Sequence, residues 1–382
     1  MMRYELVKLP MAHPGDVSEL EKRLADGTVR AEEIKGIIAQ TEGDGYARGY
    51  STLAFQVLLS ERLGWTHEEV FDRIPMMMIG KTGGLMSPHY TLFVRGDDAS
   101  GDTTGDAGLT TGAGNGNVEA SVSSDAAAVA TAGGKRFAFG VASSRRLLPE
   151  EIGTSVQVDV AAETVLAAIA DSGIASLEDV HCVEIKCPWG VGGARSKAAS
   201  ALGSAVALGE LERGRIDEAA INSDHSLYSL RTSVSAGGEQ TAVRVIVMGN
   251  REGADSSLVV GSGMMRDSFD LAGLHEVFSG MGIDSQPALP PHAQGRIRQV
   301  FVNAGADARP DIRGQRHTMH TDALSMHSGI LAKAVAHAVV GAVVGDATIL
   351  CSAGSEHQGP QGANLIAVVA EVADGAAGGE RR

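Results

Sequence analysis

Apolar runs of strand length and helix length alternate along the chain, and one order of runs occurs three times. Each copy has a strand-like run ending in a polar residue, a helix-like run, a turn with small residues and a second strand-like run. These segments lie at 33–40, 53–59, 76–80 and 87–93 in the first copy, at 180–186, 196–210, 235–239 and 243–248 in the second, and at 297–303, 330–344, 352–356 and 365–369 in the third. Strands that alternate with helices predict a protein of the α/β class.

The spacing inside the copies indicates an internal repeat. From the polar residue at the strand end to the equivalent position in the turn there are 49 positions in the second and third copies and 39 in the first. These paired positions are Gln40 and Ile79, Lys186 and Ser235, and Asn303 and Ser352. We therefore predict three similar α/β units. If a pseudo-threefold axis relates the units, their turns meet at one central site.

The predicted units are residues 1–95, 135–252 and 253–382. The segment 96–134 between the first two units is rich in Gly, Ser and Asp and poor in large apolar side chains. Burial of so few apolar groups does not offset the conformational entropy that folding removes. We therefore predict a flexible insert at 96–134.

Charge and composition narrow the class of protein. With 47 acidic and 32 basic residues the formal charge is −15, and no basic block is present, which disfavours nucleic-acid binding. The longest apolar run, at 332–344, contains Lys333 and His337 and is shorter than the roughly 20 residues of a membrane span. Three cysteines without ligand spacing and the lack of an apolar leader favour a cytoplasmic protein over a secreted, disulfide-bonded one.

The turn of the second copy combines groups suited to acyl transfer. Ser235 is followed by Ala236 and Gly237, so its hydroxyl lies beside backbone N–H groups that no large side chain covers. Such a turn can supply a nucleophile and an oxyanion hole. A serine nucleophile needs a base, and Lys186 ends an apolar strand whose burial would favour the neutral amine. Ser235 and Lys186 are therefore the candidate nucleophile and general base.

Histidine and metal chemistry are weaker alternatives. No serine lies in a GxSxG motif, which argues against a serine–histidine triad of the α/β-hydrolase type. The residues His317, His320, Asp322 and His327 could form a zinc cluster, but they lack the HExxH spacing. We predict neither a metal nor a cofactor.

Eight motifs together resemble one known family. They are Thr41-Glu-Gly-Asp-Gly, Gly84-Leu-Met-Ser-Pro-His, Leu148-Pro-Glu-Glu-Ile-Gly, Asp179-Val-His-Cys-Val-Glu-Ile-Lys-Cys-Pro, Ala199-Ser-Ala-Leu-Gly, Ser235-Ala-Gly-Gly-Glu, Arg313-Gly-Gln-Arg-His-Thr-Met and Ser352-Ala-Gly-Ser-Glu-His-Gln-Gly-Pro. Over nearly the whole chain they are similar to the cyanuric acid hydrolase and barbiturase family of ring-opening amidohydrolases. The segment 96–134 and a shortening between Cys187 and Ala199 lack family counterparts.

The resemblance implies a fold and a chemistry. The fold would be three α/β units around a pseudo-threefold axis, with the substrate at the centre, in a homotetramer. The reaction would be hydrolysis of a planar cyclic amide or imide without a catalytic metal. Each family unit contributes a Lys, a Ser and an Arg to the site. The pair assigned to the chemistry is that of the second unit, which corresponds here to Lys186 and Ser235.

This chain departs from the family pattern at most other site positions. Gln40 and Asn303 replace lysines and Ile79 replaces a serine, whereas Ser352 is retained. The three arginine positions hold Thr52, Lys197 and Ile330, although a gap shift would bring in Arg195. Because Ile79 puts apolar surface against one ring edge, we do not expect cyanuric acid to be the best substrate.

These departures define the expected ligand contacts. The residues expected to bind substrate are Gln40, Thr52, Ile79, Gly80, Lys197, Ala236, Asn303, Ser352 and Ala353. Near the end of the third unit, the family's acidic position in a structural metal loop aligns with Gly305, whereas Gln358 of that loop is retained.

Three functions are compatible with the sequence. The first is a metal-independent hydrolase that opens a cyclic amide or imide ring or cleaves a related C–N bond. The second is a binding protein that kept the fold after losing five or six of nine polar site positions. The third is a lyase, deaminase or isomerase with Lys186 as a proton shuttle. Retention of both Lys186 and Ser235 favours an enzyme.

Overall fold

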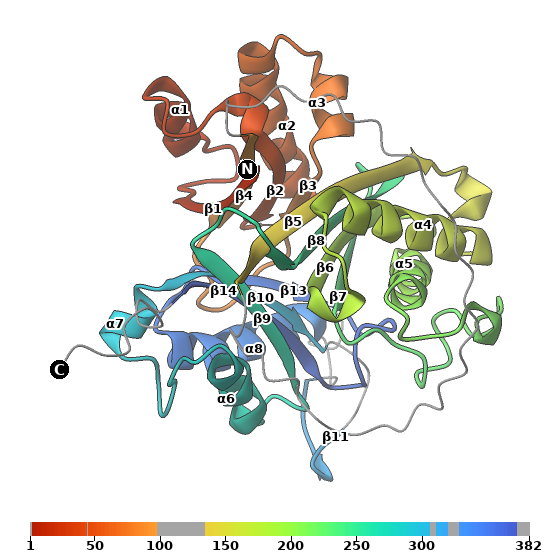
Figure 1. Ribbon diagram of the computed structural model, residues 1–382. Coiled ribbons are helices and arrows are strands. Elements are labelled where there is room, and N and C mark those ends of the chain that lie inside the picture. Colours follow the sequence, from red (N-terminus) through yellow and green to blue (C-terminus); the bar gives the residue numbers. More distant parts are fainter. Residues whose placement is uncertain (1, 44, 98–133, 306–310, 320–327, 373–382) are drawn as a thin grey trace.

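Three four-stranded sheets organise the protein (Figure 1), in a computed structural model that describes residues 2–43, 45–97, 134–305, 311–319 and 328–372. The first sheet has the order β1 (Met2–Pro10), β4 (His89–Asp97), β2 (Ile34–Gln40) and β3 (Met76–Ile79). The second has the order β5 (Lys135–Arg146), β8 (Ala242–Glu252), β6 (Val180–Pro188) and β7 (Thr232–Gly237). The third has the order β9 (Leu258–Met265), β14 (Asn364–Glu371), β10 (Ile297–Ala304) and β13 (Leu350–Ala353).

Strand pairing is the same in all three sheets. Counted in chain order within each sheet, the first strand pairs antiparallel with the fourth, and the fourth pairs antiparallel with the second. The second strand pairs parallel with the third. A parallel pair needs a crossover connection, usually a helix. The predicted fold of three similar α/β units is therefore confirmed. The exact unit boundaries stay a prediction, and nearly all of the predicted insert lies outside the described residues.

Helices cover the outward side of each sheet in Figure 1. The first unit carries α1 (Ser18–Ala25), α2 (Gly45–Leu63) and α3 (His67–Arg73), the second α4 (Ser155–Ser172) and α5 (Ala194–Ala207), and the third α6 (Leu271–Gly280), α7 (Pro291–Gln294) and α8 (Ser328–Val344). The crossovers between parallel strands contain α2, α5 and α8. A two-stranded ribbon of β11 (Asp311–Ile312) and β12 (Gln315–Arg316) lies apart from the sheets.

Alternate strand residues pack in different cores. Ile37 of β2 packs with the helices of the first unit, whereas Ile38 joins a central cluster that draws residues from all three sheets. In β10, Val302 packs outward and Phe301 joins the central cluster. Because strand side chains alternate with a period of two, the strand-end residues two positions after Ile38 and Phe301 also extend toward the centre.

The observed helices differ from the predicted ones at their ends. Helix α2 begins at Gly45, eight residues before the predicted start. Helix α5 ends at Ala207, and Gly209 with a φ of 69° turns the chain before the predicted end at 210. Such a positive φ suits glycine and ends a helix. The repeat pattern also missed β1, β5 and β9, because each lies before the run that the repeat was built on.

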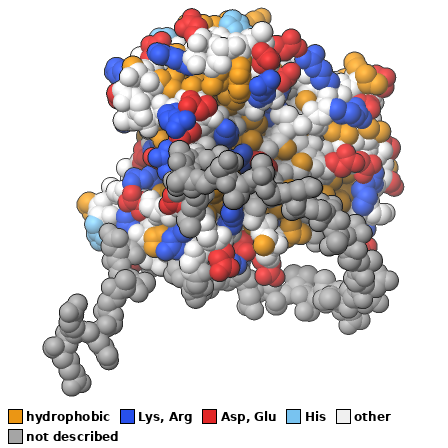
Figure 2. Space-filling model, turned by 45° about the horizontal axis from the view of Figure 1, so that its top comes forward, with side chains coloured by type: hydrophobic (Ala, Val, Ile, Leu, Met, Phe, Trp, Pro, Cys, Tyr) orange, Lys and Arg blue, Asp and Glu red, His pale blue; other side chains and the backbone are white. Residues whose placement is uncertain are grey.

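The visible surface carries charged side chains of both signs (Figure 2). On the face in Figure 2, basic and acidic side chains are interspersed. Among the described residues, no helix is both long and apolar enough to cross a membrane. Of the four residues weighed as a weaker zinc alternative, only His317 is described, and the other three lie outside the described part of the chain.

Candidate active site

Three residue pairs lie at equivalent places, near the carboxyl ends of the parallel strands. Residues paired across neighbouring strands extend their side chains from the same face of the sheet. The pairs are Gln40 with Ile79 on β2 and β3, Lys186 with Ser235 on β6 and β7, and Asn303 with Ser352 on β10 and β13. The structure therefore brings the six predicted strand-end residues together in pairs, each in the register expected from the repeat.

Two strand-end side chains reach across the boundary between units. The amine of Lys186 donates to the carbonyl oxygen of Met78 at 3.0 Å. The backbone N–H of Cys351 donates to Oε1 of Gln40 at 2.8 Å. Met78 and Cys351 each come directly before a turn position, so the strand end of one unit bonds to the turn strand of the next. These contacts bring the pairs of different units together.

Lys186 is fully buried at 0% exposure. Burial lowers the pKa of its amine to about 8, although the Glu239 carboxylate, with Oε1 3.8 Å from Nζ, opposes the shift. The positive charge of Arg48 lowers this pKa further. With a pKa near 8, roughly a tenth of the molecules carry the neutral amine at pH 7. That neutral form is the one a general base requires.

Ser235 is partly exposed beside this amine. Both residues are described, and Nζ of Lys186 does not form a hydrogen bond with Oγ of Ser235. The amine donates to the carbonyl oxygen of Met78. Catalytic hydrogen bonds are often long in the absence of substrate and shorten in the complex. The register places the two side chains at paired positions on the same face of the sheet.

Arg48 of α2 is a site residue that the sequence did not reveal. Its Nη1 donates to the carbonyl oxygen of Ala236 at 3.2 Å, and its buried Nε has no partner among the described residues. A guanidinium thus lies beside the turn after Ser235. Thr52, the predicted counterpart of the family arginine, donates its hydroxyl to the carbonyl oxygen of Arg48 at 2.9 Å. Arg48 lies one helical turn before Thr52, the position that the family resemblance assigned to an arginine.

The two other arginine positions contain no arginine near the site. Lys197 on α5 forms an ion pair with Glu356 at 2.5 Å. Arg195 donates instead to the carbonyl oxygens of Gly153 and Ile221, so the proposed gap shift does not supply a guanidinium there. Ile330, at the third position, lies against Gly83.

The remaining predicted residues present both polar and apolar groups. Nε2 of Gln40 and Oδ1 of Asn303 are buried and have no hydrogen-bond partner in the described part of the chain. Ile79 is buried in the central cluster. The carbonyl oxygen of Gly80 accepts a hydrogen bond from Lys333 at 2.8 Å. Ser352 is buried and Ala353 half-buried at the end of β13.

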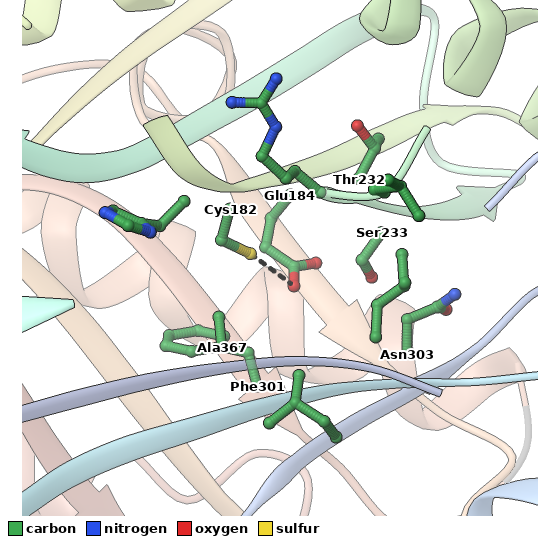
Figure 3. Close-up of a pocket in the computed structure, with 12 residues that line it drawn as sticks. Cys182, Glu184, Thr232, Ser233, Phe301, Asn303 and Ala367 are labelled. Carbon is green, nitrogen blue, oxygen red and sulfur yellow. Dashed lines mark hydrogen bonds between the residues drawn. The ribbon is translucent and has the colours of Figure 1, made fainter. Parts of the chain in front are cut away.

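A second polar pair lies directly behind the candidate base and nucleophile. Glu184 and Ser233 are paired on β6 and β7, two positions earlier and on the same face. The equivalent pairs of the other units are apolar, namely Ile38 with Met77 and Phe301 with Leu350. Glu184, Ser233 and Asn303 line a cavity of about 20 Å³. Figure 3 shows the three residues around it. The second sheet therefore carries two polar layers where the others carry one.

We expect Glu184 to make stability depend on pH. Burial raises the pKa of its carboxyl to about 8 from an ordinary value of 4.5. Between pH 4.5 and about 8, the folded protein therefore binds one more proton than the unfolded chain. The free energy of unfolding then falls as pH rises through this range. Glu184→Gln removes this titration. Its stability advantage over the wild type should grow by about 3 kcal/mol between roughly pH 6 and pH 9.

Chemical denaturation of both proteins at the two pH values measures this change. Titrations common to both proteins cancel in the difference. An advantage that stays constant with pH would show that Glu184 ionises freely in the folded state.

A family model now adds to this geometry. The model, described as an amidohydrolase ring-opening protein, matches residues 5–192 and 189–371. The chain belongs to this family. This membership confirms the predicted enzyme class, which is that of hydrolases acting on C–N bonds other than peptide bonds.

Individual relatives agree over full length. A cyanuric acid amidohydrolase of Enterobacter cloacae is 36% identical, over 97% of this chain and 100% of the relative. A cyclic amide hydrolase of Rhodococcus sp is 35% identical, over 94% and 100%. A solved cyanuric acid hydrolase, described as an evolutionary innovation by structural concatenation, has a TM-score of 0.83 and 32% identity, over 97% of this chain and 100% of that one.

The structural metal loop that the family resemblance implies lacks its acidic residue here, because Gly305 occupies that position. A side chain at Gly305 would meet the carbonyl oxygen of Ala363 with its Cβ at 2.5 Å, so an acidic residue has no room there. Oε1 of Gln358 already accepts a hydrogen bond from the backbone N–H of Val234 at 2.6 Å. Gln358 thus links the second and third units directly. At the other two unit boundaries, the equivalent links are made by Lys186 and Gln40.

Proposed function

We propose that the protein opens a cyclic amide or imide ring by hydrolysis, with Ser235 as nucleophile and Lys186 as general base. The observation that carries this proposal is the parallel pairing of the two residues on one face of the second sheet, with the amine buried and its pKa lowered to about 8. Neither other unit combines an amine with a hydroxyl at these positions. The chemistry is therefore assigned to one unit of the three.

The reaction has two stages. Neutral Lys186 takes the proton of Ser235 as Oγ attacks a ring carbonyl carbon, and backbone N–H groups at Ala236 and Gly237 stabilise the oxyanion. The C–N bond breaks as the ring nitrogen receives the proton from the Lys186 ammonium. This leaves an opened ring as an ester on Ser235. A water molecule, deprotonated by the same amine, then cleaves the ester and restores the hydroxyl.

The surrounding pairs would hold the ring. Nε2 of Gln40 can donate and Oδ1 of Asn303 can accept, because neither atom has a partner among the described residues. Ser352 would contact the far side. Ile79 offers apolar surface, so a carbonyl directed at it would lose a hydrogen bond worth about 1 to 3 kcal/mol. We therefore propose a ring with one less polar edge rather than cyanuric acid. A cytoplasmic homotetramer remains a prediction.

A substrate panel tests the reaction class. Purified protein is incubated with cyclic imides, pyrimidine-diones and open-chain amides, and the product masses are measured. We expect a ring substrate to gain one water, with faster turnover for a ring that has an apolar edge than for cyanuric acid. A product of unchanged mass would indicate isomerisation, and loss of ammonia would indicate deamination. Tight binding without any product would favour the non-catalytic alternative.

A further inference from the structure

The boundary between the second and third units departs from the threefold pattern. At the other two boundaries, Lys186 and Gln40 bond to the backbone of the residue that precedes the turn position of the neighbouring unit. The same pattern would join Asn303 to Val234. The backbone N–H of Val234 donates instead to Oε1 of Gln358 at 2.6 Å. Among the described residues, the strand end of the third unit therefore does not make the link that its two counterparts make.

The side chain of Asn303 is left with an unpaired acceptor. It is one methylene group shorter than that of Gln40, its counterpart in the first unit. Its Nδ2 donates to the carbonyl oxygen of Gly354 at 3.3 Å. Its Oδ1 is buried and has no hydrogen-bond partner in the described part of the chain. A buried acceptor of this kind is costly unless a water or another donor reaches it.

A cavity of about 20 Å³ lies beside this amide, between the second and third sheets (Figure 3). The side chains of His181, Arg231 and Thr232 line it but form hydrogen bonds with residues outside it. Ser233 and Asn303 line it as well, and within the described ranges the buried Oγ of Ser233 also has no partner. One water needs a cavity of about 10 to 15 Å³ and two to four polar partners.

Glu184 supplies a third polar partner from the second sheet. Its Oε1 accepts a weak hydrogen bond from the thiol of Cys182 at 3.9 Å, which leaves Oε2 for the cavity. Burial raises the pKa of this carboxyl to about 8, although the nearby Ser233 hydroxyl opposes the shift. At pH 7 the carboxyl therefore carries a proton and can donate a hydrogen bond. The carboxyl and the hydroxyl lie close together without a direct hydrogen bond, as expected if a water bridges them.

We propose that this cavity binds one water, which accepts a hydrogen bond from Glu184 and donates to Oδ1 of Asn303 and Oγ of Ser233. Glu184 is then a positioning residue for the ring. Through the water it holds the Asn303 amide with Nδ2 on Gly354 and with one lone pair of Oδ1 open to the substrate. The positioning role rests on the proposed function, because the ring contact of Asn303 belongs to it. The water site requires no reaction.

High-resolution crystal structures of the ligand-free wild type, Glu184→Met and Glu184→Gln test the water site. Methionine should be tolerated, because the equivalent positions of the other sheets hold the apolar residues Ile38 and Phe301. The wild type should show one water within hydrogen-bond distance of Glu184, Ser233 and Asn303. Glu184→Met should lose the water, and its Asn303 side chain should leave Gly354 or occupy two rotamers.

Glu184→Gln should keep both features, because its amide can donate from the same place. An empty cavity in the wild type, or a water that contacts Asn303 but not Glu184, would overturn the proposal. The wild-type structure alone decides this point if Glu184→Met does not fold.

A double-mutant cycle measures whether Glu184 and Asn303 act through one bridge. Chemical denaturation at pH 7 gives the unfolding equilibrium constants of Glu184→Met, Asn303→Ala and the double variant. Because either single change breaks the same bridge, the double variant should lose about tenfold less than the product of the single losses. In the control cycle of Glu184→Met with Gln40→Ala, the losses should multiply within about twofold. Equal coupling in both cycles would show that no specific bridge joins Glu184 to Asn303.

Kinetics separate positioning from a general loss of structure. With a ring that the wild type hydrolyses, Glu184→Met should raise KM about three- to tenfold and change kcat less than about threefold. Glu184→Gln should keep a KM close to that of the wild type. Partial unfolding would instead lower the apparent kcat at constant KM, and that result would overturn the positioning role. If no ring is hydrolysed, the proposed reaction fails, whereas the crystal structures and the cycle still decide the water site.

Discussion

Replacing Ser235 with Ala should lower kcat by at least about 10³-fold with a substrate identified in the panel. The reason is that the variant loses the oxygen that forms the ester, and no other hydroxyl is paired with a lysine at the three strand ends. Steady-state kinetics and a thermal unfolding curve measure the two effects separately. The fold should survive, because Ser235 is partly exposed and the change removes a single oxygen.

Ser352→Ala is the matched control for that experiment. Ser352 occupies the same register position in the third sheet but is paired with Asn303, which cannot act as a base. We expect KM to rise by about three- to thirtyfold, as for loss of one ligand hydrogen bond, with kcat within about tenfold of the wild type. If both variants retain wild-type kcat, or if Ser352→Ala suffers the larger loss, Ser235 is not the nucleophile.

The sequence was sufficient to predict the repeat and its register. Equal spacing of 49 positions in two units corresponds to the observed pairing of Lys186 with Ser235 and Asn303 with Ser352. The shorter spacing in the first unit still brings Gln40 beside Ile79. Spacing succeeds here because one strand, one crossover and one parallel strand form a local unit whose geometry recurs.

Contacts between units could not be predicted in the same way. Arg48 reaches Ala236 across 188 positions, and Lys333 reaches Gly80 across 253 positions. No periodicity of a single unit encodes such contacts. For Lys333 the sequence holds one signal, a charged residue in an otherwise apolar helix. A lysine in so apolar a run is buried on folding and then needs a partner.

The three units carry different residue pairs at the same layer, namely Gln40 with Ile79, Lys186 with Ser235, and Asn303 with Ser352. The second unit has a further polar pair, Glu184 with Ser233, behind the first. Under the proposed function, the second unit carries the reaction and the other two recognise the ring. Such asymmetry suits a substrate whose edges differ in polarity.

Lys186→Met should lower kcat by about 10² to 10⁴-fold, the usual contribution of a general base, and should remove the pH dependence that the base imposes. In the wild type the neutral amine is the active form, so kcat/KM should rise about tenfold per pH unit until pH reaches about 8 and then level off. A rising limb that persists in Lys186→Met would assign the base elsewhere.

Glu239→Gln tests the direction of that limb without touching either reacting group. The Glu239 carboxylate raises the pKa of Lys186 against the effect of burial, and its Oε1 lies 3.8 Å from Nζ. Removing the negative charge should therefore shift the limb to lower pH and enlarge the neutral fraction at pH 7. A weaker base also takes a proton less readily, so the plateau should fall slightly while activity at pH 7 rises. A limb that stays at the same pH would mean that a group other than Lys186 titrates, and Lys186 would then act only as a fixed hydrogen-bond donor.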